Sequence, residues 1–169
     1  MRRNKGPRRV VPLAVGCVAA LAFAAGCAGP SATGQASGAA ATKKGQRVVV
    51  DARSVPGVGT VLVTSDGYAL YMFSADDQKR VTCTGVCAGT WPPLAIAWGT
   101  ALVAGPGVKQ SLLSSVPDPA GGRVVTYGGW PLYTYAADVE PDQANGQDLD
   151  LNGGYWYVIS PSGQPLETP

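Results

Sequence analysis

No histidine occurs in the 169-residue sequence. An imidazole side chain is required by Ser-His-Asp and Cys-His catalytic sites and by His-ligated zinc, copper and haem centres. The composition therefore excludes these classes of site. Charged residues are also scarce, at 14% of the chain against 46% hydrophobic residues, and this balance argues against a disordered acidic or basic tail. Any chemistry must come from Cys, Asp, Glu, Tyr or the backbone.

The N-terminal segment is expected to direct export. The first nine residues hold five basic side chains and no acidic one, and an apolar run follows over residues 10–25. A basic start followed by a short apolar run is typical of a secretory signal peptide, and the run is shorter than the roughly 20 residues of a membrane-spanning helix. We therefore predict that residues 1–26 are a signal peptide.

The apolar run ends in Ala24-Ala25-Gly26-Cys27, which resembles the bacterial lipobox. In that motif the Cys receives diacylglycerol and becomes the mature N-terminus; Ala24 stands where the motif usually has Leu. The resemblance implies a lipoprotein anchored through Cys27 to the extracytoplasmic face of the bacterial cell membrane. An ordinary cleaved signal peptide with an incidental Cys is the alternative.

Removing the signal peptide reverses the sign of the net charge. The whole sequence carries +2, but five of its 13 Lys and Arg lie within residues 1–26, leaving eight basic and eleven acidic residues, a net of −3. This balance gives no support for nucleic-acid binding, which needs a clustered basic face. Residues 27–46 contain no aromatic or branched aliphatic side chain, so we predict a flexible tether there and a folded domain over 47–169.

The domain shows the alternation of β-strands. Turn residues at Ser65-Asp66-Gly67 and Gly128-Gly129 separate apolar runs and predict two hairpins, and a short helical turn is expected over 108–115, ended by Pro117. Strands are expected at 60–64, 68–73, 123–127, 130–135 and 155–159. The predicted fold is all-β: two homologous antiparallel hairpin repeats that share one core, with one short helical turn.

The two hairpins are copies of one another. Residues 67–76 align without gaps on 129–138, an offset of 62 residues, and we place repeat 1 at about 58–99 and repeat 2 at about 121–163. Neither half holds enough strands to bury a face alone, so both must contribute to one core. We expect four aromatic side chains to fill that core: Tyr71, Phe73, Tyr133 and Tyr135.

The repeated segments resemble a known bacterial lipoprotein family, the secreted repeat of unknown function. Each copy contains Tyr-x-aromatic-x-x-Asp, at 71–76 and at 133–138, and residues 83–94 match a Cys-x-Gly-x-Cys-Ala-x-x-Trp-Pro-Pro-Leu signature. The similarity covers about residues 58–163. It implies an exported, usually lipid-anchored envelope protein and no defined activity.

Cys83 and Cys87 are the most informative pair of candidate site residues. After loss of the signal peptide and acylation of Cys27 they are the only thiols left, and such a pair usually forms a disulfide outside the cytoplasm. Copper(I) binding or redox chemistry is the alternative, with Met72 as a third soft ligand. The missing histidine and the absence of a Cys-x-x-Cys motif weigh against that alternative.

Acidic residues provide weaker candidates. Asp148, Asp150 and Asn152 match the first half of a calcium-binding loop, but Ile159 stands where a bidentate Glu is needed. A solvated hairpin loop is the simpler interpretation, so no metal site is favoured. Asp76 and Asp138 could act as a hydrolase carboxylate pair, or as turn-capping residues that accept backbone N–H bonds, and we favour the second.

A binding surface could be formed by exposed aromatic rings. Tyr68 and Trp130 lie at matching repeat positions near the start of their strands, where they could reach the rim of the core and stack on glycan rings. Core packing is the alternative. The function we expect is a non-catalytic binding or scaffolding module that needs no cofactor and has an envelope glycan or protein as partner; the alternative is an extracytoplasmic copper or redox protein using Cys83 and Cys87.

Overall fold

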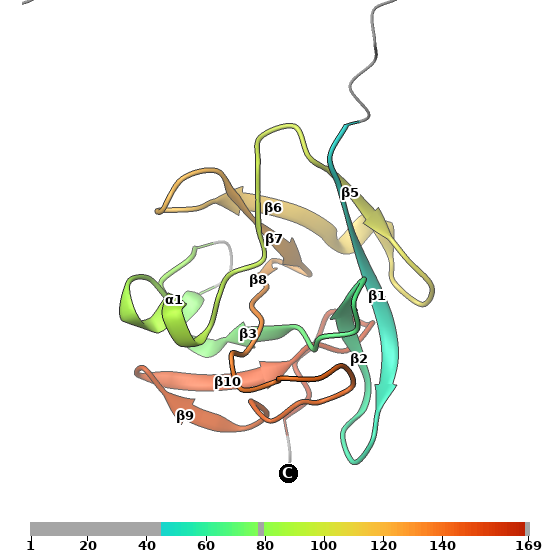
Figure 1. The fold of residues 1–169 in the computed structure, drawn as a ribbon, viewed down its shortest axis with the longest axis vertical. Helices are drawn as coiled ribbons and strands as arrows, with labels where there is room; N and C mark the ends of the chain where they lie inside the picture. The colour runs from blue at the N-terminus through green and yellow to red at the C-terminus, as the bar shows by residue number, and fades with distance from the viewer. Residues whose placement is uncertain (1–44, 78–79, 168–169) are drawn as a thin grey trace, which may run out of the picture. The chain divides into compact units, whose positions relative to one another are not determined.

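The computed structural model describes residues 45–77 and 80–167, and the predicted signal peptide and Cys27 lie outside these ranges. The strands of the described residues are β1 (Arg47–Val55), β2 (Gly59–Thr64), β3 (Tyr71–Phe73), β4 (Ala95–Ile96), β5 (Ala101–Ala104), β6 (Leu113–Pro117), β7 (Arg123–Tyr127), β8 (Trp130–Pro131), β9 (Leu149–Leu151) and β10 (Gly154–Val158). The helical segments are η1 (Ser74–Asp76), α1 (Val86–Thr90) and η2 (Gln110–Leu112). Figure 1 shows these strands as three small sheets.

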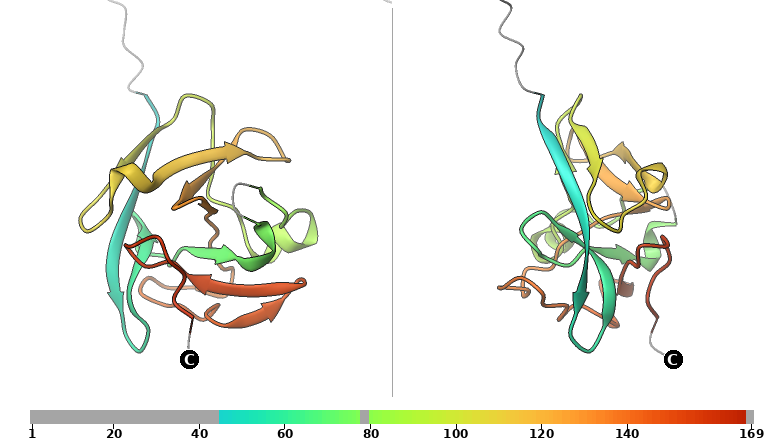
Figure 2. Two further views of the ribbon diagram at one scale, coloured as in Figure 1. Left: turned by 180° about the vertical axis from the view of Figure 1, so that it is seen from behind. Right: turned by 90° about the vertical axis from the view of Figure 1, so that its right-hand side faces the viewer.

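Strand β1 joins two partners into the first sheet. Its first residues pair in parallel with β5, and from Val50 onward it pairs antiparallel with β2. Figure 2 shows β1 as a long strand that runs past both partners. Three consecutive residues of β2, Val61, Leu62 and Val63, are fully buried. An unbroken apolar run of this kind is typical of a strand covered on both faces.

Both predicted hairpin turns are present, but the second strand of each hairpin leaves its partner early. In the first repeat Val63 bridges Ala69, after which β3 turns away and pairs with β10. In the second repeat β8 pairs with β7 across Gly128-Gly129, both at positive φ, as a tight hairpin turn requires. Each repeat therefore shares its pairing with the other instead of closing a complete hairpin of its own.

The predicted helical turn over 108–115 is wrong in its second half. Only Gln110–Leu112 forms a 3₁₀ turn, and Leu113–Pro117 is strand β6, paired antiparallel with β7. Helix propensity is a preference of less than about 1 kcal/mol per residue, and the hydrogen bonds of a full strand ladder override it. Pro117 is tolerated because β6 is an edge strand of its sheet.

The core consists of two apolar clusters, and β3 contributes to both. Tyr71 and Phe73 point into one cluster together with Trp156, while Met72 points into the other with Leu132. Both clusters contain residues of both repeats, so the predicted all-β fold with a shared core is confirmed. Tyr71, Phe73 and Tyr133 are buried as predicted, and Tyr135 is half-buried. Within the described residues, no helix has the length and apolar character needed to cross a membrane.

Candidate functional site

The repeated Tyr and Asp side chains meet in the centre of the domain. Tyr71 begins β3 and Asp76 ends the following turn η1, while Tyr133 and Asp138 repeat this spacing after β8. All four side chains are buried, with exposed fractions of 0% for Asp76 and 5% for Asp138. The site is therefore closed to solvent.

Each tyrosine reaches the aspartate of the other repeat. Tyr71 and Tyr133 form an antiparallel bridge in which each backbone N–H donates to the other's carbonyl at 2.9 Å. This local two-fold arrangement turns each side chain toward the opposite repeat. The Tyr71 hydroxyl donates to Asp138 Oδ2 at 2.6 Å, and the Tyr133 hydroxyl donates to Asp76 Oδ2 at 2.6 Å.

The second oxygen of each carboxylate holds the chain that follows it. Asp76 Oδ1 accepts hydrogen bonds from the Thr82 backbone N–H at 2.8 Å and from the Thr82 hydroxyl at 2.7 Å. Asp138 Oδ1 accepts from the Asn145 backbone N–H at 2.8 Å. The turn-capping interpretation of both aspartates is thus correct but incomplete, because the cross-repeat phenol is the partner it missed.

Burial sets the protonation of this site. It raises the pKa of the Asp76 carboxyl, and the hydrogen bonds from Tyr133 and Thr82 oppose that rise. Burial, followed by the bond to Asp138, raises the pKa of Tyr71 far above its ordinary value. Burial and the bond to Asp76 do the same for the pKa of Tyr133. Both phenols therefore remain neutral hydrogen-bond donors at physiological pH.

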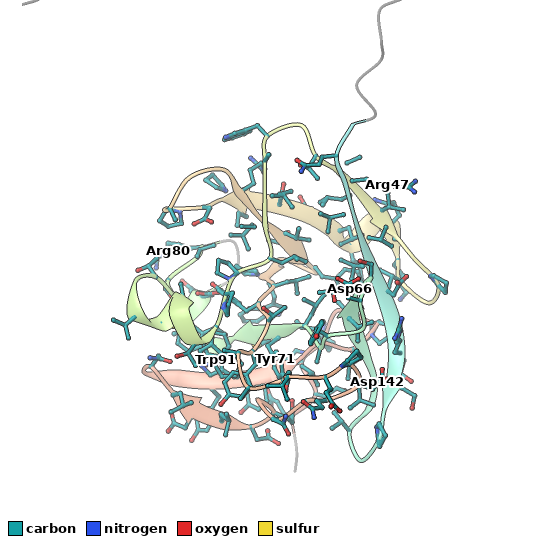
Figure 3. The ribbon with its side chains drawn as sticks, viewed as in Figure 1. Arg47, Asp66, Tyr71, Arg80, Trp91 and Asp142 are labelled. Atoms are coloured by element: carbon teal, nitrogen blue, oxygen red, sulfur yellow. A yellow bond between two sulfur atoms is a disulfide. The ribbon has the colours of Figure 1, made fainter. Side chains whose placement is uncertain are left out.

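Two tryptophans complete the site. Trp91 follows α1 and stacks on Trp156 of β10 with ring centroids 3.9 Å apart and planes inclined by 1°. Tyr71 meets the edge of Trp91 at 5.3 Å, and Tyr133 meets the edge of Trp156 at 5.2 Å. Figure 3 shows Tyr71 and Trp91 next to one another close to β10. The loose sequence match of residues 89–91 with 154–156 is the signal that could have identified this pair.

Cys83 and Cys87 form the predicted disulfide, with a Cα–Cα distance of 5.3 Å. Cys83 is buried in the cluster of Tyr71 and Trp91, whereas Met72 packs in the other cluster. A disulfide offers no thiolate to a metal ion. The pair and Met72 are therefore not assembled as a soft-metal site.

The acidic candidates lie on a hairpin. Asp148 precedes β9, Asp150 lies within β9, and Asn152-Gly153 forms the turn to β10. Asn152 adopts a positive φ of 62°, which suits a tight hairpin turn. Across residues 45–77 and 80–167, no group of three or more His, Cys, Asp and Glu side chains is placed to hold a metal ion.

The two candidate binding aromatics, Tyr68 and Trp130, lie on opposite sides of the bridge between Tyr71 and Tyr133. Tyr68 and Trp130 each precede their bridging tyrosine by three residues, and the bridge between Tyr71 and Tyr133 is antiparallel. The two segments therefore run in opposite directions away from it. Both rings are half-buried, and Trp130 packs against the second apolar cluster.

A pocket that the sequence did not indicate lies beside the disulfide. It has a volume of about 230 Å³ and is lined by the Cys83–Gly85 turn, Ala88 and Pro93 on one side and by the 118–120 turn on the other. Its wall is mostly apolar. Val86, at the start of α1 next to this pocket in sequence, is 91% exposed. A pocket between segments about 35 residues apart leaves no trace in local periodicity.

Comparison with known protein families assigns the chain to one of them. A family model described as a secreted repeat of unknown function matches residues 54–95 and 114–160, together more than half of the sequence. The chain belongs to this family. No curated protein and no solved structure matches the chain. The family description agrees with an exported protein. In this secreted repeat, the paired copies of Tyr-x-aromatic-x-x-Asp supply the hydrogen bonds that join one copy to the other.

Proposed function

We propose that the protein is a lipid-anchored, non-catalytic binding module of the bacterial cell envelope. The family description, the basic and apolar residues of 1–26 and the lipobox-like sequence ending at Cys27 support export and acylation. Residues 27–46 would serve as the tether between the lipid and the folded domain. The module would stand on the extracytoplasmic face of the membrane.

The arrangement of the repeated residues supports a non-catalytic role. Catalytic carboxylates need access to a substrate, but Asp76 and Asp138 are buried and their oxygens are engaged by phenols and backbone N–H groups. Their hydrogen bonds join the repeats to each other. Binding would then use the surface that this core supports.

The observation that carries the binding role is the apolar pocket beside the disulfide. The disulfide between Cys83 and Cys87 braces one wall, and the turn containing Pro119 forms the other. An exposed Val86 on the same short helix as Ala88 adds apolar surface that folding leaves uncovered. A braced, largely apolar hollow of this size fits one aliphatic or aromatic side chain.

The pocket chemistry favours a protein partner over a glycan. Its lining contains no aromatic ring on which a sugar could stack, and the carboxylate Asp118 already accepts the Ala120 backbone N–H at 2.9 Å. A sugar needs several convergent hydrogen-bond groups, whereas an apolar side chain needs only a dry cavity. We therefore assign the partner as an envelope protein that inserts one apolar side chain.

Lipid anchoring is tested with Cys27→Ala in the full-length chain. The variant is expected in the culture supernatant or the soluble envelope fraction, while the parent protein stays with the membrane and incorporates a labelled fatty acid. Cys17→Ala is the matched control, because Cys17 lies within the predicted signal peptide, and it should keep the membrane location. Membrane retention of Cys27→Ala would contradict the anchor.

The partner is tested by photo-crosslinking in intact cells. A photoreactive amino acid at Val86 should yield a protein adduct, and the same group at Val139, which is 71% exposed elsewhere on the domain, should not. Filling the pocket by Ala88→Phe should abolish the adduct, whereas Ala137→Phe on an exposed turn should leave it. An adduct that persists in Ala88→Phe, or none at Val86, would overturn the assigned pocket.

A further inference from the structure

Aromatic rings of both repeats form one continuous stack in the core. Tyr135 stacks on Trp91 at 4.1 Å, Trp91 on Trp156 at 3.9 Å, and Trp156 on Phe73 at 4.2 Å. Electronic coupling between rings falls exponentially with their separation, so rings in van der Waals contact exchange an electron rapidly. An electron removed from one ring of this stack is therefore readily replaced from the next.

The two buried tyrosines beside this stack each have a carboxylate base for their proton. The Tyr71 and Tyr133 hydroxyls donate at 2.6 Å to carboxylates, a short charge-assisted distance. The buried Trp91 Nε1 finds no hydrogen-bond partner within the described part of the chain, and Trp156 Nε1 donates to the Leu151 carbonyl, which is a weak base. An oxidised indole here keeps its proton, whereas an oxidised phenol can pass its proton to Asp.

The two ends of the stack differ in exposure and in ease of oxidation. Tyr135 is half-buried and gives the stack access to the surface, whereas its repeat equivalent Phe73 is 2% exposed and is far harder to oxidise than tyrosine or tryptophan. An oxidising equivalent would therefore enter at Tyr135 and end on the tyrosines that can lose a proton. The sequence match between the repeats conceals this difference, because both rings satisfy the aromatic position of the motif.

We propose that the core is a one-electron redox relay, which accepts an oxidising equivalent from an outer-sphere one-electron oxidant at the surface and stores it as a neutral tyrosyl radical. The oxidant takes one electron from the stack through Tyr135, and Tyr71 then gives one electron to the oxidised Trp91. The Tyr71 hydroxyl proton passes to Asp138 Oδ2 as the O–H bond breaks. The products are the reduced oxidant, the Tyr71 phenoxyl radical and a protonated Asp138.

The other tyrosine–aspartate pair can carry out the same transfer of one electron and one proton. Tyr133 touches the edge of Trp156 and can pass its proton to Asp76 Oδ2. Buried ionised groups are expensive to desolvate, and a core of similar volume built from apolar side chains is often at least as stable. Packing alone therefore does not require two phenol–carboxylate pairs against two stacked indoles. Proton-coupled storage of a radical uses each of these groups.

The test oxidises the folded domain with photogenerated tris(bipyridine)ruthenium(III) and follows the product by rapid-freeze electron paramagnetic resonance. Tyr155 and Trp98, which are 47% and 70% exposed, are both replaced by Phe in every sample to remove direct oxidation of these exposed rings. A neutral tyrosyl signal is expected, identified by the change it shows with ring-deuterated tyrosine. Its formation should be slower in deuterium oxide, because a proton moves in the step.

Asp76→Asn combined with Asp138→Asn removes both bases while keeping an oxygen that accepts each phenol hydrogen bond. Radical formation should slow by roughly 10²-fold, the usual contribution of a positioned base, and the signal should shift to an indole radical cation. Tyr127→Phe is the matched control. Tyr127 is a fully buried tyrosine whose hydroxyl meets Pro161 O and Lys109 N instead of a carboxylate, so its loss should change nothing.

A second variant keeps the test decisive if the Asn pair does not fold. Tyr135→Leu removes the entry ring, which lies 4.1 Å from Trp91 and 6.3 Å from Tyr71, and should reduce the tyrosyl yield at least about 10-fold, with folding checked by circular dichroism. A radical of unchanged yield and rate in folded Tyr135→Leu or in the Asn pair would overturn the relay. So would formation at the same rate in deuterium oxide.

Discussion

Trp91 and Trp156 come from different repeats and lie ring on ring, with centroids 3.9 Å apart. Around them the cross-repeat bonds of Tyr71 to Asp138 and of Tyr133 to Asp76 follow the same local two-fold relation. The centre of the domain is therefore an interface between repeats, and its stability depends on contacts that neither repeat can make alone.

Gly146→Ala should destabilise the domain strongly. A Cβ at this position would lie 2.6 Å from one ring atom of Trp91 and 3.0 Å from one of Tyr71, so the stack would have to shift. Overpacking of this kind costs about 1–3 kcal/mol, and a tightly held aromatic stack places it at the upper end. Gly89→Ala is the control, since no atom lies within 4 Å of its added Cβ and alanine favours the helix. Urea unfolding of both variants checks this, and equal stabilities would contradict it.

Breaking one cross-repeat pair should weaken the whole domain. Tyr71→Phe leaves Asp138 buried without its phenol, and losing a hydrogen bond to a charged group costs about 1.5–3 kcal/mol. A double-mutant cycle of Tyr71→Phe with Asp138→Ala should show a coupling of at least about 1 kcal/mol. The same-repeat cycle of Tyr71→Phe with Asp76→Ala is the control and should show a smaller coupling. Equal couplings would argue against the crossed pairing.

Stability should fall at alkaline pH because the buried phenols resist ionisation. Tyr71 and Tyr133 have pKa values far above the ordinary 10.0 in the folded chain, so above pH 10 the folded state binds more protons than the unfolded state. Their contribution is fully present below pH 10 and is lost as the pH rises, by about 1.4 kcal/mol per pH unit for each tyrosine. Urea unfolding from pH 9 to 11 measures this slope. The double variant Tyr71→Phe, Tyr133→Phe should lack it.

The disulfide should contribute modestly. Its two cysteines are four positions apart, and closing so small a loop stabilises by about 2 kcal/mol in the chain-entropy estimate. A phosphine reductant should lower the melting temperature of the parent protein in thermal unfolding. It should leave the melting temperature of the double variant Cys83→Ser, Cys87→Ser unchanged. Mass spectrometry of the exported domain should find no free thiol at either position. Two free thiols would contradict the disulfide.

Much of the local structure could be predicted from residue patterns. Alternation and the Gly128-Gly129 turn predicted strand and turn positions, and the 62-residue offset predicted that both halves share a core. The helical prediction fails over residues 113–115, which belong to β6, because their composition suits a helix as well as a strand. The pairing of β6 with β7, a segment separated from it by a turn, decided the outcome. The short helix α1 was not anticipated, since one helical turn leaves no periodicity to detect.

The sequence by itself determined the residue types that enter the core, the spacing of tyrosine and aspartate in each repeat, and the two cysteines available for one disulfide. Only the tertiary structure decided which tyrosine meets which aspartate. The period of a strand indicates the face on which a side chain lies, but it does not indicate which segment lies opposite that face. The antiparallel bridge between Tyr71 and Tyr133 determines which aspartate each tyrosine contacts. The same bridge turned two equal motifs into one shared site.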